Sequence, residues 1–74
     1  MTYIMRVYYR SPEQWKDEAV ESAVGFPASG SGTNLETMIR DMDFDCVSML
    51  DAQAAECRAR EVSFITDSKV IHVE

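Results

Sequence analysis

The fold is decided by the stretch TMIRDMDFDCV, residues 37 to 47, in which apolar and polar side chains alternate. One side of an extended chain would carry Met38, Met42, Phe44 and Cys46. The other side would carry Thr37, Ile39, Asp41, Asp43 and Asp45. Successive side chains of a strand point to opposite faces, so this pattern determines which face is buried. It predicts a half-buried strand over residues 37–47.

A second strand of the same kind is predicted over residues 2–10, which are rich in β-branched and aromatic residues. One face carries Tyr3, Met5, Val7 and Tyr9. The other carries Thr2, Ile4, Arg6, Tyr8 and Arg10.

Residues 26–35, which precede the strand predicted at 37–47, are rich in Gly, Ser and Pro. We expect a turn at residues 29–32 and a short strand at 26–28, which Pro27 would restrict to a sheet edge.

Two helices are predicted between the strands. The first begins at Ser11 as N-cap, with Pro12 at the first helical position and Gln14 completing a capping box. Gly25 is expected to end it. Its apolar stripe would place these residues in the core: Trp15, Ala19, Val20, Ala23 and Val24.

The second helix is capped by Ser48, with Asp51 three residues on, and Glu56 and Arg60 form a favourable i,i+4 pair. Two rows of residues align at helical spacing on it. One contains Leu50, Ala54, Cys57 and Glu61. The other contains Ala52, Ala55, Ala59 and Val62, whose small side chains allow close approach to a sheet.

Beyond this helix, residues 62–66 and 70–73 are β-prone and flank a likely turn at residues 67–69, so they form either a hairpin or one strand with a bulge. The resulting order predicts an α+β, ferredoxin-like β-α-β-β-α-β sandwich, with an antiparallel sheet and both helices on one face. Without the weak strand at 26–28, a simpler α+β sandwich remains. One domain over residues 1–74 is expected from the length.

The chain carries seven basic and thirteen acidic residues, for a net charge of −6. Because phosphate-backbone binding depends on clustered Lys and Arg, this balance argues against direct nucleic-acid binding. No apolar run reaches the roughly 18 residues of a membrane span, and the first residues lack signal-peptide character. Cys46 and Cys57 are too few for a disulfide scaffold. A reducing, cytoplasmic setting is expected, in the host cell if the protein is phage-encoded.

The motif Asp41-x-Asp43-x-Asp45 suggests calcium, but an EF-hand loop counted from Asp41 would need Gly and Glu where Cys46 and Ala52 stand. On a strand these carboxylates would lie about 6–7 Å apart, too far for one ion. The only histidine is His72, and the Gly-rich stretch lacks the lysine of a phosphate-binding loop. We therefore expect no enzyme, metal or cofactor.

The sheet face left open by the helices would combine charged and apolar side chains. Its candidate binding residues are Asp41, Asp43, Asp45, Tyr8 and Ile39. Cross-strand ion pairs of the Asp row with Arg6 and Arg10 are the structural interpretation of that row. The functional hypothesis is a non-enzymatic module that binds a protein partner with a basic surface.

One version of this hypothesis is a phage-type inhibitor that occupies the nucleic-acid groove of a bacterial complex. Anti-CRISPR proteins are typically small, acidic and intracellular in this way, although no motif connects them to this chain.

The alternative is a small homodimeric ligand-binding domain or enzyme with a pocket between two sheets. Its polar groups would be Arg6, Tyr8 and His72. The sequence leaves the choice between monomer and homodimer open.

Overall fold

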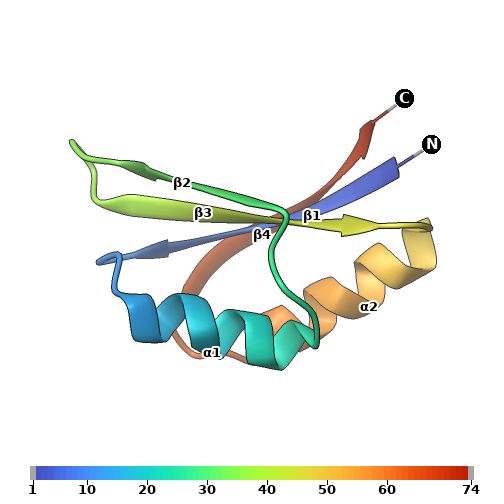
Figure 1. Cartoon of the computed structure of the whole chain (residues 1–74), viewed down its shortest axis with the longest axis horizontal. Helices are drawn as coiled ribbons and strands as arrows, with labels where there is room; N and C mark the ends of the chain where they lie inside the picture. Colours follow the sequence, from blue (N-terminus) through green and yellow to red (C-terminus); the bar gives the residue numbers. More distant parts are fainter. Residues whose placement is uncertain (1, 74) are drawn as a thin grey trace.

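The computed structural model describes residues 2–73 of the chain. Its elements are β1 (Thr2–Arg10), α1 (Gln14–Val24), β2 (Gly30–Asn34), β3 (Ile39–Cys46), α2 (Met49–Arg60) and β4 (Ile65–Val73). The strands form one antiparallel sheet in the order β2-β3-β1-β4, and both helices lie on the same side of it (Figure 1). This is the predicted α+β arrangement, consistent with a ferredoxin-like fold. Met1 and Glu74 of the predicted domain lie outside the described residues.

The core lies between the sheet and the two helices. β1 and β3 are the central strands, and they contribute Met5, Val7, Tyr9, Met42, Phe44 and Cys46. The helices contribute Val20, Val24, Ala52, Ala55 and Ala59. The register pairs Met5 with Phe44 and Val7 with Met42, so the predicted buried faces of both strands lie on the same side. The alternation in residues 37–47 is confirmed over the observed strand.

The second strand differs from the prediction. It occupies Gly30–Asn34 at the sheet edge, where a turn was expected, whereas residues 26–28 and Pro27 form no strand. Backbone pairing with β3 determines this strand, and that pairing needs no apolar side chains. The turn lies instead at residues 35–38, where the Asn34 side chain accepts a hydrogen bond from the backbone N–H of Glu36 at 2.9 Å.

Helix α1 begins later than predicted. Its N-cap is Glu13, and Ser11 adopts a left-handed conformation with φ of 59°. The backbone N–H of Ser11 donates to the carbonyl of Met38 at 3.1 Å, which joins the β1–α1 connection to the β2–β3 turn instead of capping the helix. Gly25 ends the helix as predicted, with φ of 99° and its N–H bonded to the Glu21 carbonyl.

Trp15 is 55% exposed, so the prediction of a core tryptophan is wrong. The reason lies in the helix rotation. Asp17 faces the sheet, and residues two positions apart point to nearly opposite sides of a helix. Trp15 therefore lies outside, with its ring edge-on to Phe64 at 5.6 Å.

Helix α2 begins as predicted, because the Ser48 hydroxyl accepts a hydrogen bond from the Asp51 N–H at 3.1 Å. Of its two predicted rows, the alanines of the second are buried, whereas Leu50 and Cys57 of the first are exposed. Both cysteines are free. Glu56 and Arg60 are joined through a third residue: the Ser68 hydroxyl donates to Glu56 at 2.8 Å and accepts from Arg60 at 2.7 Å.

The C-terminal stretch is one strand with a register shift opposite Tyr8 and Tyr9, and it has no turn at residues 67–69. Of the two arrangements left open by the sequence, the single strand with an irregularity is observed. Pairing with the long central strand β1 accounts for its length, since each residue from 67 to 73 has a partner on β1.

Candidate partner-binding face

We call the side of the sheet that faces away from the helices the open face. The alternation of the strands places on it Ile4, Arg6, Tyr8 and Arg10 of β1, Ile39, Asp41, Asp43 and Asp45 of β3, and Asp67, Lys69 and Ile71 of β4. Neither helix covers this side (Figure 1). All five predicted binding residues are therefore on one surface. They are Asp41, Asp43, Asp45, Tyr8 and Ile39.

Asp43 is engaged by Arg6 on the neighbouring strand. Nε of Arg6 donates to Oδ1 of Asp43 at 2.6 Å, and Nη2 donates to Oδ2 at 2.9 Å. The two side chains are only 30% and 20% exposed. The Asp43 carboxylate, followed by the Tyr8 side chain, raises the pKa of Arg6. The cross-strand ion pair expected for Arg6 is thus present, and it neutralises the central member of the Asp row.

Asp41 and Asp45 form no ion pair within residues 2–73. Asp41 lies beside Gly32 of β2, where a Cβ atom would come within 3.3 Å of Oδ1 of Asp41. The glycine therefore leaves room for this partly buried carboxylate. Asp45 is exposed at the end of β3. Neither carboxylate is therefore paired with a cationic side chain within residues 2–73.

Tyr8 on β1 and Ile39 on β3 are partly buried among the charged residues of the open face. Tyr8 lies opposite Asp41 in the register, and Nζ of Lys69 is 5.9 Å from the centre of its ring. Three acidic groups of the open face lie on β3 and a fourth, Asp67, lies on β4, whereas the basic groups Arg6, Arg10 and Lys69 lie on β1 and β4. The acidic groups of the open face are thus concentrated on β3, and apolar residues lie among the charged ones.

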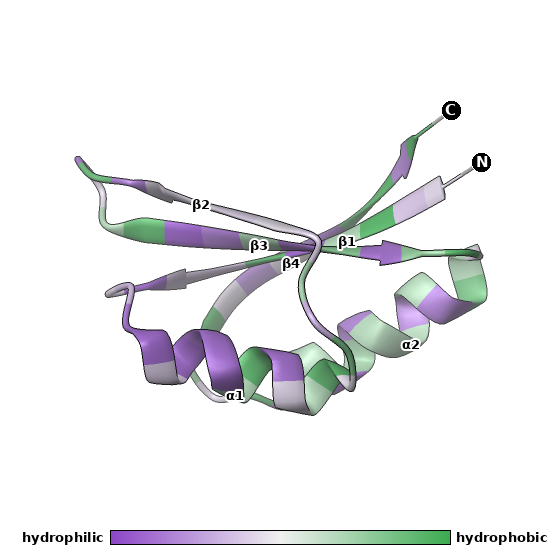
Figure 2. Cartoon of the chain, in the orientation of Figure 1, coloured by the Kyte–Doolittle hydropathy of each residue, from purple (hydrophilic) through white to green (hydrophobic). Residues whose placement is uncertain are grey.

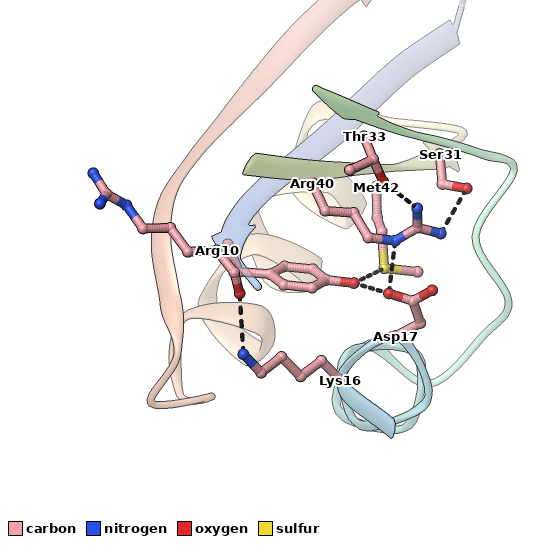
Figure 3. Close-up of polar contacts among 8 residues, drawn as sticks. Arg10, Lys16, Asp17, Ser31, Thr33, Arg40 and Met42 are labelled. Atoms are coloured by element: carbon pink, nitrogen blue, oxygen red, sulfur yellow. Dashed lines mark hydrogen bonds and ion pairs between the residues drawn. The ribbon is translucent and has the colours of Figure 1, made fainter. Parts of the chain in front are cut away.

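A second polar cluster joins α1 to the side of the sheet that the helices cover (Figure 3). Asp17 of α1 accepts hydrogen bonds from the Tyr9 hydroxyl and from Nε of Arg40, the latter at 2.8 Å. Arg40 also donates to the hydroxyls of Thr33 at 2.8 Å and Ser31 at 3.1 Å. Sequence reasoning missed this cluster. Its signal was a charged Arg40 at a core-facing position of the strand, which requires a partner.

This cluster stabilises the packing of α1 against the sheet, and it does not activate Tyr9 as a catalytic group. Burial, followed by the hydrogen bond to Asp17, raises the pKa of Tyr9, so its hydroxyl stays protonated at neutral pH. A general base or nucleophile needs a pKa near the working pH. Asp17 and Arg40 form an ion pair with side chains about one-fifth exposed, and this pair ties α1 to β3.

The polar groups of the ligand-binding alternative do not come together. Arg6 and Tyr8 lie on the open face. His72 follows the open-face residue Ile71 on β4, so it points to the other side of the sheet, where it stacks on Tyr3 with ring centroids 4.8 Å apart. Within residues 2–73, no group of three or more His, Cys, Asp or Glu side chains is placed to hold a metal ion. In the same residues, no helix is long and apolar enough to cross a membrane.

No protein-family model matches the chain, and no curated protein or solved structure matches it. The functional argument therefore rests on the chemistry of the open face.

Proposed function

We propose that the protein is a non-enzymatic interaction module that binds the basic surface of a partner protein. The observation that carries this proposal is the pair of carboxylates, Asp41 and Asp45, that have no ion-pair partner within residues 2–73 on an uncovered sheet face. Tyr8 and Ile39 supply apolar contact area beside them. Contact surfaces combine such apolar groups with a polar rim.

A nucleic-acid-binding groove is the basic surface that this face fits best. Such grooves gather Lys and Arg to neutralise phosphates. A chain with a net charge of −6 is attracted to such a groove at long range, and the Asp side chains then pair with its cations. Occupying the groove would exclude the nucleic acid. The proposed activity is therefore competitive inhibition of a nucleic-acid-binding complex, as in phage-type inhibitors of bacterial defence.

The test combines capture with competition. The tagged protein is incubated with bacterial lysate and washed at low salt and at about 1 M salt, where the Debye length falls to about 3 Å. Captured proteins are identified by mass spectrometry and assayed for nucleic-acid binding with and without the chain. We expect a stoichiometric partner that is released at high salt and loses its nucleic acid when the chain is added.

Two variants with opposite charge changes test whether Asp41 and Asp45 bind the partner. Asp41→Asn with Asp45→Asn removes both unpaired carboxylates and should abolish capture. Arg6→Gln is the matched control on the same face, because it removes a positive charge and releases Asp43, so capture should be retained or strengthened. Unchanged capture by the double Asp variant would eliminate this surface as the binding site.

A homodimer joined through the open face is the second candidate. The acidic column of β3 lies beside the basic groups of β1 and β4, so two copies related by a twofold axis could pair unlike charges. Light scattering at low and high salt tests this arrangement. A salt-sensitive dimer would favour it, and a thermal-shift screen with metabolites would then examine the space between the sheets.

A further inference from the structure

The junction between β3 and α2 carries apolar side chains that the core does not use. Val47 is 85% exposed and Leu50 is 78% exposed, on either side of the Ser48 cap. In Figure 2 the hydrophobic colour continues from the end of β3 into the start of α2. Single exposed apolar residues are common, but apolar residues grouped beside a pocket mark a contact surface.

A pocket of about 280 Å³ opens at this junction. Its apolar walls come from Phe26, Cys46, Val47 and Ala54. The Phe26 ring rests edge-on against the buried Phe44, with centroids 5.7 Å apart, so this wall is attached to the core. Small-molecule sites usually have volumes of about 300–1,000 Å³. A smaller pocket with apolar walls suits one side chain of a protein segment.

Two acidic residues, Asp45 and Asp51, are among those that line the same pocket. Neither forms an ion pair within residues 2–73. Arg58 also lines the pocket, but its Nε donates to the carbonyl of Val24 at 3.0 Å, which directs that group to the end of α1. The pocket therefore combines an apolar interior with two acidic residues and one arginine at its side, and this net negative charge is complementary to an apolar residue flanked by Lys or Arg.

We propose that this pocket receives a single apolar side chain from a basic segment of the partner protein. The inference rests on the proposed function and deepens it, because Asp45 belongs both to the open face and to the pocket. An apolar anchor in a pocket contributes a large share of the affinity of many interfaces. A second copy of this chain is disfavoured as occupant, since a symmetric contact would place Asp45 and Asp51 against the same acidic groups.

The experiment titrates the protein, labelled with nitrogen-15, with short peptides and follows backbone amide shifts by NMR. The probe is a seven-residue peptide with a central leucine, a lysine two positions to either side, and glycine and serine elsewhere. One control peptide replaces the leucine with serine, and another replaces both lysines with glutamate. Peptide concentrations up to about 5 mM detect affinities near 1 mM.

We expect saturable shifts at residues 45–54 and at Phe26, and binding about tenfold weaker for each control peptide. Ala54→Leu fills the pocket from an exposed helix position and should abolish the titration, whereas Gln53→Leu, at the adjacent exposed position outside the pocket, should leave it unchanged. Absence of shifts, equal binding of all three peptides, or full binding to Ala54→Leu would each overturn the proposal.

The experiments distinguish a failure of the pocket proposal from a failure of the proposed function. Asp41 does not line the pocket. Asp41→Asn should therefore leave the peptide titration intact while weakening partner capture. A peptide that binds, combined with capture that is insensitive to the Asp41 and Asp45 substitutions, supports the pocket and contradicts the open-face proposal. The reverse pattern supports the open face and contradicts the pocket.

Discussion

The guanidinium of Arg6 on β1 holds the carboxylate of Asp43 on β3 through two parallel hydrogen bonds, Nε to Oδ1 at 2.6 Å and Nη2 to Oδ2 at 2.9 Å. The bidentate geometry fixes the centre of the open face, because it links the two central strands across their register. It also divides the Asp row into one paired carboxylate between two that have no ion-pair partner within residues 2–73.

A double-mutant cycle with Arg6→Gln and Asp43→Asn should measure a coupling free energy of about 1 kcal/mol. This is the upper end for surface pairs, because the geometry is bidentate, but both side chains are partly solvated. Urea unfolding of the four proteins gives the value. The coupling should decrease at high salt. Coupling near zero at low salt would mean that the pair does not persist in solution.

The hydroxyl of Tyr9 should make stability fall at alkaline pH. Its pKa is raised by burial and by Asp17, so the unfolded chain loses this proton first, near pH 10. The stabilisation is therefore complete below about pH 10 and decreases as the pH rises toward the folded pKa.

Tyr9→Phe provides the comparison for this prediction. At neutral pH the variant should be less stable by about 1 kcal/mol, because the hydrogen bond to Asp17 is lost. The difference from the unmodified protein should shrink above about pH 10. Tyr3 and Tyr8 are present in both proteins and cancel. A difference that stays constant from pH 7 to 11 would contradict the assignment.

The two cysteines should react with thiol reagents at different rates. Burial raises the pKa of Cys46, with Asp51 and Asp45 adding to the effect, whereas Cys57 is exposed on α2. In the folded protein, a chromogenic disulfide reagent should modify Cys57 first and Cys46 slowly. Cys57→Ser should leave only the slow phase, and denaturant should remove the difference. Equal rates in the folded protein would show that Cys46 is accessible.

Two leucine substitutions on α2 should have different effects on stability. Ala55→Leu inserts a larger side chain at a fully buried contact with the sheet and should destabilise by about 1–3 kcal/mol. Ala54→Leu, at the adjacent exposed position, should change stability by less than about 0.5 kcal/mol. Chemical denaturation compares the two. Similar losses at both positions would mean that α2 is rotated relative to the described structure.

The order of elements could be predicted because three segments carry strong local signals. Residues 2–10 and 37–47 alternate with period 2, and Ser48 caps a helix of alanine-rich sequence. The position of the edge strand, Gly30–Asn34, could not be predicted from the sequence. Its backbone pairs with β3, and its Gly, Ser and Asn residues have no β-preference to indicate that pairing.

The rotation of α1 was missed because the apolar pattern was read without Asp17. The inward row of this helix is Asp17, Val20 and Val24, and its first member is charged. Only the positions of Tyr9 and Arg40 across the sheet explain why a carboxylate points inward. Likewise, the Asp row was placed on the correct face, but the choice of Asp43 as the partner of Arg6 depends on a register that the sequence does not determine.

The two helices are attached to the sheet by different chemistry, and this will shape how the sequence changes among related chains. In α1 the attachment is reciprocal: Asp17 and Arg40 need each other, so these positions should covary. In α2 the close approach to the sheet depends on the size of Ala52, Ala55 and Ala59, beside the hydrogen bonds of Glu56 and Arg60 to Ser68, so each alanine should remain small independently of the others.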